Sequence, residues 1–196
     1  MVKLRDIWQS LYPYGIFRTG EAVYLTFDDG PIPEVTPKVL EILDRYGVKA
    51  TFFMVGENID KHPEIYEQVV KAGHAIGNHT YNHLKGWRCS YSAYMANAAK
   101  FPKATSLFRP PYGKATLRQR RALHHMGYRL IYWDVLTRDY DKSVSPETML
   151  ARIKRETRPG SIINFHDSLK SNERMLAVLP QAIEWLKKEG YEIALL

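Results

Sequence analysis

Strand-like and helix-like segments alternate along this chain from about residue 22 to its end. Short apolar runs predict the strands, and Pro, Ser, Thr and Gly punctuate the segments between them. One example is the helix predicted to have Thr36 as its N-cap and Pro37 as its first residue. Such alternation is typical of parallel strands joined by crossover helices, in either a closed barrel or an open doubly wound sheet. Seven strands are predicted, one fewer than in the common eightfold barrel, and they span Ala22–Phe27, Ala50–Val55, Ala75–Asn78, Leu107–Arg109, Arg129–Val135, Ser161–Phe165 and Tyr191–Leu195.

The chemically reactive side chains lie at or after the carboxyl ends of these strands. They are Asp28 and Asp29 at the first strand, His79 and His83 at the third, Arg109 at the fourth, Asp134 and Asp139 at the fifth, and His166 at the sixth. Parallel α/β folds gather their catalytic groups at this end of the sheet. We therefore expect residues that are distant in the sequence to converge on one face.

Length and composition exclude several classes of protein. A chain of 196 residues, 45% hydrophobic and 25% charged, suits a single globular domain. Cys89 is the only cysteine, which excludes an internal disulfide. We expect no membrane span, because no apolar stretch is long enough to cross a bilayer. We also expect a cytoplasmic location, because the N-terminus lacks the apolar core of a signal peptide.

The net charge of +7 at pH 7 raises the question of nucleic-acid binding. The basic clusters, Arg118–Arg121 and Lys187–Lys188, are short and lie in predicted helices, where a solvated face explains them. No zinc-finger or RNA-binding strand motif is present. We therefore predict no nucleic-acid partner and attribute the charge to solubility or to attraction for anionic polymers.

Two adjacent carboxylates, Asp28 and Asp29, end the first predicted strand in the segment TFDDGP. Buried carboxylates at the end of an apolar strand are costly unless a neighbouring group uses them. Adjacent side chains diverge on leaving a strand, so one carboxylate can ligate a cation while the other acts as a base. The alternative is a plain turn, for which Asp-Gly-Pro is well suited.

The segment HTYNH places His79 and His83 four residues apart. On a helical turn that spacing brings both imidazoles to one side, within reach of a single metal ion. One carboxylate and two imidazoles make three ligands, which leaves a position open for water in a catalytic zinc site. The same trio describes non-haem iron oxygenases, which we rank low because their ligands usually sit on an antiparallel β scaffold in another order.

Arg109 and His166 each follow a predicted strand. Two prolines after Arg109 rigidify its loop, and a fixed guanidinium beside Asp28 would keep that carboxylate ionised. A histidine at a strand end that pairs with a carboxylate has its protonated form stabilised, which suits a general acid. The alternatives are prolines that merely end the strand and a buried, hydrogen-bonded imidazole.

Five segments, TFDDG, HTYNH, RPPYG, WDVLTRDY and NFHD, occur in this order along the chain. Together they resemble the five motifs of the polysaccharide deacetylase family, also called the NodB homology domain or carbohydrate esterase family four. The resemblance covers residues 22–196. It implies a distorted, incomplete (β/α) barrel, so we predict an N-terminal extension at 1–20 and a polysaccharide deacetylase catalytic domain at 21–196.

The resemblance also implies roles for individual residues. The metal ligands would be Asp29, His79 and His83, holding a divalent ion that is usually Zn²⁺ and sometimes Co²⁺. Asp28 would be the general base, oriented by Arg109. His166 would be the general acid, tethered by Asp139, and the backbone N–H of Tyr112 would help to stabilise the oxyanion.

The chain departs from the family pattern near its substrate pocket. Tyr140 stands where a Trp is common, and Leu136 occupies a position that is often acidic. Asn164 replaces a Leu that usually lines the pocket for the acetyl methyl group. We therefore expect a more polar acyl pocket, unless Phe165 or Trp133 substitutes.

We predict that the protein hydrolyses N-acetyl groups of a glycan or oligosaccharide that contains N-acetylglucosamine. Aromatic rings near the strand ends could stack on the sugar, although packing in the core is the commoner role of any one such ring; the candidates are Trp87, Tyr112, Trp133 and Tyr140. One alternative is a metal-dependent hydrolase of the same fold that acts on O-acetyl esters or small non-peptide amides. The other is a non-catalytic sugar- or polyanion-binding module, which would be expected to lack Asp28 or a metal ligand.

Overall fold

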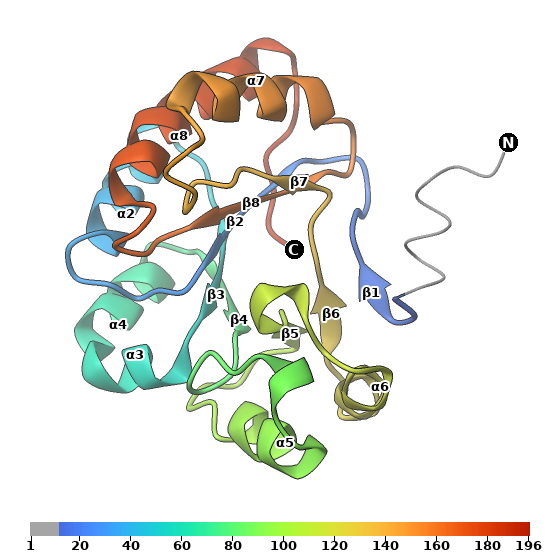
Figure 1. Ribbon diagram of the computed structural model, residues 1–196. Coiled ribbons are helices and arrows are strands. Elements are labelled where there is room, and N and C mark those ends of the chain that lie inside the picture. Colours follow the sequence, from blue (N-terminus) through green and yellow to red (C-terminus); the bar gives the residue numbers. More distant parts are fainter. Residues whose placement is uncertain (1–11) are drawn as a thin grey trace, which may run out of the picture.

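The computed structural model describes residues 12–196, in which all the strands belong to one curled parallel sheet with helices around it (Figure 1). The strand order is β1-β6-β5-β4-β3-β2-β8-β7, and every neighbouring pair is parallel. The strands are β1 (Gly15–Ile16), β2 (Tyr24–Asp28), β3 (Thr51–Met54), β4 (Ala75–Asn78), β5 (Leu107–Phe108), β6 (Arg129–Ile131), β7 (Val135–Leu136) and β8 (Ile162–His166). The α-helices are α2 (Thr36–Arg45), α3 (Gly56–Lys61), α4 (Pro63–Lys71), α5 (Tyr91–Ala99), α6 (Leu117–His125), α7 (Pro146–Glu156) and α8 (Asn172–Lys188), and two short 3₁₀ turns are η1 (Gly86–Arg88) and η2 (Pro111–Gly113).

The architecture confirms the predicted distorted barrel, although the strands differ from the predicted seven. The predicted strand Arg129–Val135 is split into β6 and β7, and the C-terminal strand is reduced to a single bridge between Val23 and Ile193. β1 was not predicted, because it lies in the N-terminal extension. Residues 1–11 of that extension lie outside the described part of the chain, whereas Gly15 and Ile16 join the sheet through the pairing of β1 with β6.

Residues 132–134 form a seam between the two edges of the sheet. β6 lies beside β1 near one edge, and β7 forms the other edge against β8. The strand breaks here because the chain leaves one set of partners and joins another. The carboxylate of Asp134 holds the seam to β8, since its two oxygens accept hydrogen bonds from the Ile162 N–H and the Ser161 hydroxyl, both at 2.9 Å. Asp134 therefore has a structural role.

Alternation along β2 and β8 separates the hydrophobic core from the site. Successive side chains of a strand point to opposite faces of its sheet. Leu25 and Phe27 of β2 and their neighbours Ile163 and Phe165 of β8 join the large core that packs against α2, α4, α7 and α8. The intervening residues face the inside of the curled sheet, and they are Thr26, Asp28, Asn164 and His166. The paired register places Thr26 opposite Asn164 and Asp28 opposite His166.

The inside of the sheet has a second apolar cluster below these polar residues. Tyr24, Phe53, Leu107, Ile131 and Ile162 come from five different strands and pack together there. The last residues of the chain, Ala194 and Leu196, pack against this cluster. Polar groups therefore occupy the carboxyl end of the inner space, and apolar groups fill the rest.

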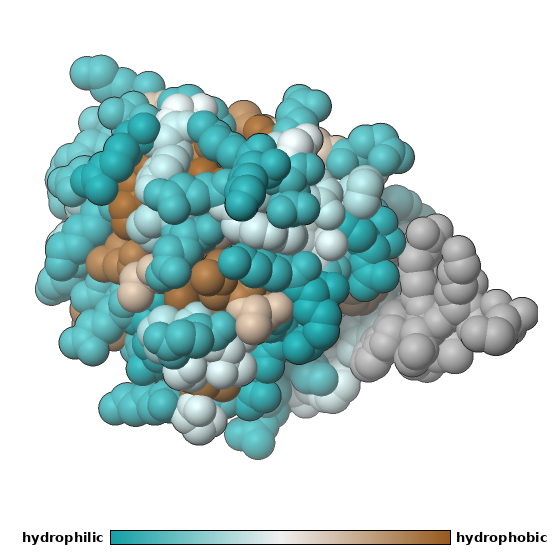
Figure 2. Space-filling model, turned by 90° about the horizontal axis from the view of Figure 1, so that it is seen from above, coloured by the Kyte–Doolittle hydropathy of each residue, from teal (hydrophilic) through white to brown (hydrophobic). Residues whose placement is uncertain are grey.

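The outer surface is largely hydrophilic on the face drawn in Figure 2, where hydrophobic residues appear in small patches between hydrophilic ones. Among residues 12–196, no helix combines the length and apolar character that a membrane span requires.

Candidate active site

The buried pair of Asp28 and Arg109 lies at the centre of the predicted site. Nη1 of Arg109 donates to Oδ1 of Asp28 at 2.7 Å, and both side chains are almost fully buried. The amide of Asn164 completes the arrangement, because its Nδ2 donates to Oδ2 of Asp28 at 3.1 Å and its Oδ1 accepts from Nη1 of Arg109 at 2.7 Å. Both oxygens of the proposed base are thus held in fixed directions.

Arg109 also supports the barrel wall from inside. Its Nε and Nη2 donate to the carbonyl oxygens of Ile131 and Tyr132, at 3.3 and 3.0 Å, where β6 gives way to the seam. Its guanidinium packs over the ring of Phe53, 4.1 Å from the centroid. A buried guanidinium must have its donors satisfied, and here they join three separate strands.

The three predicted metal ligands come together at the carboxyl ends of β2 and β4. Asp29, His79 and His83 each offer a ligand atom, and these atoms lie within 4.8 Å of one another. Oδ1 of Asp29 is 3.2 Å from Nε2 of His83 and 3.8 Å from Nε2 of His79. This oxygen is buried and has no hydrogen-bond partner within residues 12–196. A buried oxygen facing two imidazole nitrogens fits a divalent cation with nitrogen and oxygen ligands.

The tautomer of His79 is fixed by the backbone of Arg109. Nδ1 of His79 lies 2.7 Å from the carbonyl oxygen of Arg109, which can only accept, so Nδ1 carries the proton. Nε2 is left with a lone pair toward Asp29, as in metal-ligating histidines held by a second group. Burial lowers the pKa of His79 to about 4, despite the opposing charge of Asp28, so the imidazole is neutral at pH 7.

The electrostatics of Asp29 also suit a ligand. Burial disfavours the charged form, but the neighbouring imidazoles outweigh it and hold the pKa of this carboxyl below its usual range. The backbone of Asp29 is left-handed at φ 88°, and its carbonyl accepts from Nδ2 of Asn58 at 2.8 Å. That contact with α3 holds the residue in a conformation that L-residues rarely adopt. Asn58 was not predicted, because nothing in the sequence joins it to Asp29.

The two histidines are brought together by a loop, and the predicted helical turn is wrong. Within the segment from 79 to 83, Thr80 and His83 have left-handed φ values of 63° and 55°. Oδ1 of Asn97 on α5 accepts from two backbone N–H groups of this loop, at 2.9 and 3.0 Å. The imidazole rings still meet, with centroids 5.0 Å apart.

The pair of His166 and Asp139 occupies the other side of the site. Oδ1 of Asp139 lies 2.8 Å from Nδ1 of His166, and Oδ2 accepts the backbone N–H of the same residue at 2.7 Å. Burial alone would lower the pKa of His166, but the charge and hydrogen bond of fully buried Asp139 raise it to about 9. The imidazole is therefore protonated at pH 7, as a general acid must be.

Asp167 follows His166 but serves a different part of the structure. Its oxygens accept from the Gly30 N–H at 3.0 Å and the Thr36 hydroxyl at 2.6 Å. Thr36 is thereby drawn into the interior and does not cap α2, contrary to the sequence prediction. Burial raises the pKa of Asp167 to about 8. This buried carboxyl fixes the turn after Asp29. No such role was predicted for Asp167, which stood out in the sequence only as the last residue of the NFHD segment.

The residues predicted to contact substrate are placed differently from one another. Tyr112 is 56% exposed and its ring lies 4.7 Å from that of His83, while Tyr140 packs edge-on against His166 at 5.0 Å. Trp133 is partly buried beside Arg109. Asn164, which was expected to make the acyl pocket more polar, is fully buried. Its amide is directed instead at the Asp28–Arg109 pair.

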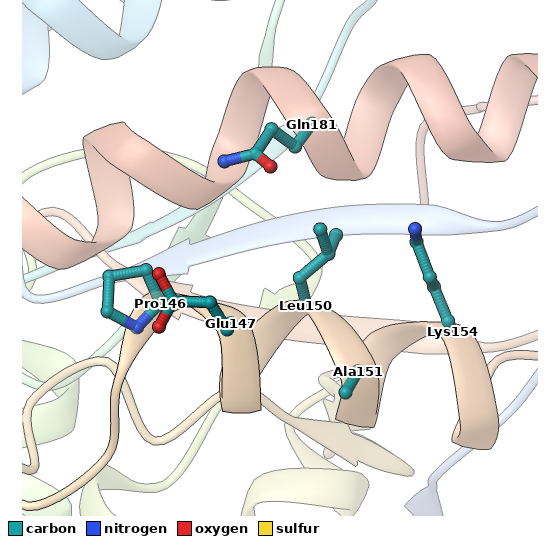
Figure 3. Close-up of a pocket in the computed structure, with 6 residues that line it drawn as sticks. All are labelled: Pro146, Glu147, Leu150, Ala151, Lys154 and Gln181. Atoms are coloured by element: carbon teal, nitrogen blue, oxygen red, sulfur yellow. The ribbon is translucent and has the colours of Figure 1, made fainter.

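A separate shallow hollow lies between α7 and α8 (Figure 3). Its walls carry one acidic and one basic side chain, Glu147 and Lys154, among less polar neighbours. None of the predicted site residues lines it, so it is distinct from the carboxyl ends of the strands.

Comparisons with known proteins agree with this geometry. A model of the polysaccharide deacetylase family matches residues 18–131, and the chain belongs to this family. A peptidoglycan-N-acetylglucosamine deacetylase of Bacillus cereus is 34% identical, with 93% of this chain and 70% of that protein covered. A chitooligosaccharide deacetylase of Azorhizobium caulinodans is 35% identical, with 91% and 94% covered. The crystal structure of a peptidoglycan N-acetylglucosamine deacetylase superposes with a TM-score of 0.87 at 31% identity, covering 100% of this chain and 95% of that one.

Replacing Gly30 with Ala is expected to disrupt the turn that holds Asp29. A Cβ atom at this position would lie 2.1 Å from Oδ2 of Asp167, which is itself buried and hydrogen-bonded. Overpacking of this kind should lower the free energy of unfolding by about 3 kcal/mol, and metal affinity should fall with it. Urea unfolding and a zinc titration measure the two effects.

Gly127→Ala is the matched control, because its Cβ would meet nothing within 4 Å and only its φ of 90° is strained. That strain should cost about 1 kcal/mol and leave metal affinity unchanged. Equal effects of the two substitutions would contradict the steric argument.

Proposed function

We propose that the protein is a metal-dependent hydrolase that removes N-acetyl groups from N-acetylglucosamine units of a glycan and releases acetate. The observation that carries the proposal is the cluster of Asp29, His79 and His83 beside a buried base and a separate acid pair. The similarity to named N-acetylglucosamine and chitooligosaccharide deacetylases supports the same substrate class.

The ligand set favours Zn²⁺. Two neutral imidazoles and one carboxylate are the donors of many catalytic zinc sites, and three protein ligands leave a coordination position free. Co²⁺ prefers similar donors and is the alternative. When bound, the cation supplies a Lewis acid that polarises the amide carbonyl and increases the acidity of water.

The side chains divide the remaining chemistry between them. Oδ2 of Asp28 takes the proton of the attacking water, while Arg109 and Asn164 hold the carboxylate in position. Nδ1 of His166 is engaged by Asp139, so Nε2 is the atom that donates a proton to the departing nitrogen. This donation matters because an unprotonated amide nitrogen is a poor leaving group. The backbone N–H of Tyr112 is proposed to donate to the developing oxyanion.

The first test is acetate release from N-acetylated oligosaccharides and from O-acetyl esters by protein that has been stripped of metal and reloaded with Zn²⁺ or Co²⁺. We expect metal-dependent acetate from the amides. Asp28→Asn should reduce kcat about 10²- to 10⁴-fold without loss of bound metal, whereas Asp29→Asn should lose the metal as well. Glu41→Gln, an exposed acid on α2, is the control and should leave the rate unchanged. Hydrolysis of esters alone would favour the ester hydrolase and overturn the proposal.

Asp139→Asn is expected to move the alkaline limb of the pH profile of kcat to lower pH. Activity requires protonated His166, so it should be lost as pH rises through the pKa of about 9. Without the carboxylate that raises this pKa, the limb should shift down by about 1–3 pH units. Asp141→Asn removes an acid two residues away that pairs with Arg138 and should leave the limb in place. An unshifted limb in Asp139→Asn would exclude His166 as the tethered acid.

Asn164→Leu is expected to lower kcat while leaving acyl preference unchanged. The substitution removes hydrogen bonds to two charged groups, Asp28 and Arg109. Such bonds contribute about 1.5–3 kcal/mol each, so a fall of roughly ten- to a hundredfold is expected. Rates for N-formyl, N-acetyl and N-propionyl substrates should fall together. A change in their ratio would instead assign Asn164 to the acyl pocket.

A further inference from the structure

A long part of the chain contains no acidic residue. Between Glu67 and Asp134 there is no Asp or Glu, although eleven of the 28 Lys and Arg residues lie there. This part supplies β4, α5, β5, α6 and β6, which form one side of the curled sheet (Figure 1). Two of the three proposed metal ligands, His79 and His83, also belong to it. The positive charge of the protein is therefore concentrated on the side of the site that carries these histidines.

Two loops on this side are joined into one surface. The loop after β4 carries Lys85 and Trp87, and the loop after β5 carries Tyr112 and Lys114; we refer to these four residues as the basic aromatic ledge. The N–H of Gly86 donates to the carbonyl oxygen of Lys114 at 3.0 Å. The carbonyl of Gly86 in turn accepts from the buried amide of Gln119 at 3.0 Å. These hydrogen bonds hold the two loops in register.

The ledge begins beside the three proposed metal ligands and carries two aromatic rings that are about half exposed. The ring of Tyr112 lies 4.7 Å from that of His83 and is 56% exposed, and Trp87 is 52% exposed. Nζ of Lys85 lies 5.1 Å from the centroid of Tyr112, and Nζ of Lys114 lies 4.3 Å from that of Trp87. Within residues 12–196 neither lysine forms an ion pair. Each ammonium group is thus free to meet an anion carried by a ligand that covers the rings.

We propose that the ledge binds a carboxylate-bearing glycan strand next to the N-acetylated sugar that is hydrolysed, so that the substrate class is an anionic glycan. This inference rests on the proposed function. The apolar face of a sugar ring can cover Trp87 or Tyr112, because exposed aromatic rings offer large apolar contact areas. Carboxylates on the same strand then reach Lys85 and Lys114. A neutral strand would gain only the contact with the rings.

A glycan fits the ledge better than a nucleic acid does. The ledge starts at His83, so a polymer that lies on it reaches the three proposed metal ligands, where the proposed chemistry needs an acetylated sugar. The field from a basic surface also raises the local concentration of an anionic substrate, and salt screens this attraction. A preference of this kind is therefore expected to depend on ionic strength.

The test compares two oligomers of equal length, a neutral N-acetylglucosamine oligomer and its carboxymethylated form. In 50 mM salt, kcat/KM for the anionic oligomer should be about five times that for the neutral oligomer. The difference should arise from a lower KM for the anionic oligomer. Lys85→Gln with Lys114→Gln should bring the ratio to near one, as should 0.5 M salt. Lys38→Gln with Lys188→Gln removes the same charge from exposed positions on α2 and α8 and should leave the ratio unchanged. A ratio of one in the unaltered protein, or a preference that survives the ledge variant, would overturn the proposal.

Binding separates this inference from the proposed function. Equilibrium titration of the Asp28→Asn protein with the carboxymethylated oligomer requires no turnover. Trp87→Ala should weaken that binding about tenfold, because it removes the exposed aromatic ring that the sugar would cover. If binding depends on the two lysines but no substrate releases acetate, the proposed role of the ledge stands and the proposed deacetylase function is wrong. Tighter binding of a single-stranded oligonucleotide with the same number of charges, through the same two lysines, would reject the glycan.

Discussion

The buried ion pair between Arg109 and Asp28 supports both the barrel and the site. Breaking a buried pair by removing one partner typically costs about 3–5 kcal/mol, because the other charge is left uncompensated. Arg109 is exceptionally well connected: its guanidinium contacts Asp28 and the carbonyls of Ile131 and Tyr132, and its own carbonyl fixes the tautomer of His79. The proposed base, one proposed metal ligand and the barrel wall consequently depend on one residue, so the fold and the geometry of the site cannot vary independently.

Much of the fold could be predicted because its signals are local. The alternation of strand and helix patterns and the reactive residues at strand ends can be recognised from neighbouring residues alone, and they correctly indicated parallel strands with a shared face. The pattern left a barrel and an open sheet as alternatives, and the distorted barrel was implied by the family resemblance. β1 escaped prediction because Gly15 and Ile16 make a strand only by pairing with Leu130 and Ile131. The split of Arg129–Val135 was equally hidden, because an extended segment does not reveal that its two halves pair with different edges of a sheet.

The sequence identified the reactive residues of the candidate site but not the residues that hold them in place. The two carboxylates, the two histidines and the acid pair stand in recognisable motifs, and the structure brings them together. Asn58, Asn97 and Asp167 hold the loops that carry these residues, yet their partners lie elsewhere in the chain. The contacts of Asn164 with Asp28 and Arg109 could not be predicted, because its neighbours in the sequence do not reveal what lies across the inner space of the barrel. Once β8 is paired in register with β2, alternation places its amide beside Asp28.

The seam at residues 132–134 gives the barrel an unusual kind of closure. Neighbouring strands are joined by hydrogen bonds, which can break and re-form, whereas β6 and β7 are also joined directly by the three residues of the peptide chain between them. Four residue steps from Ile131 to Val135 reach at most about 14 Å, which sets an upper limit on how far β6 and β7 can separate. This short connection therefore limits the distance between the side of the site that carries the proposed metal ligands and the side that carries His166 and Asp139. Adaptation to bulkier polymers would then depend mainly on the loops above the strands, because the connecting residues limit how far the barrel can widen on this side.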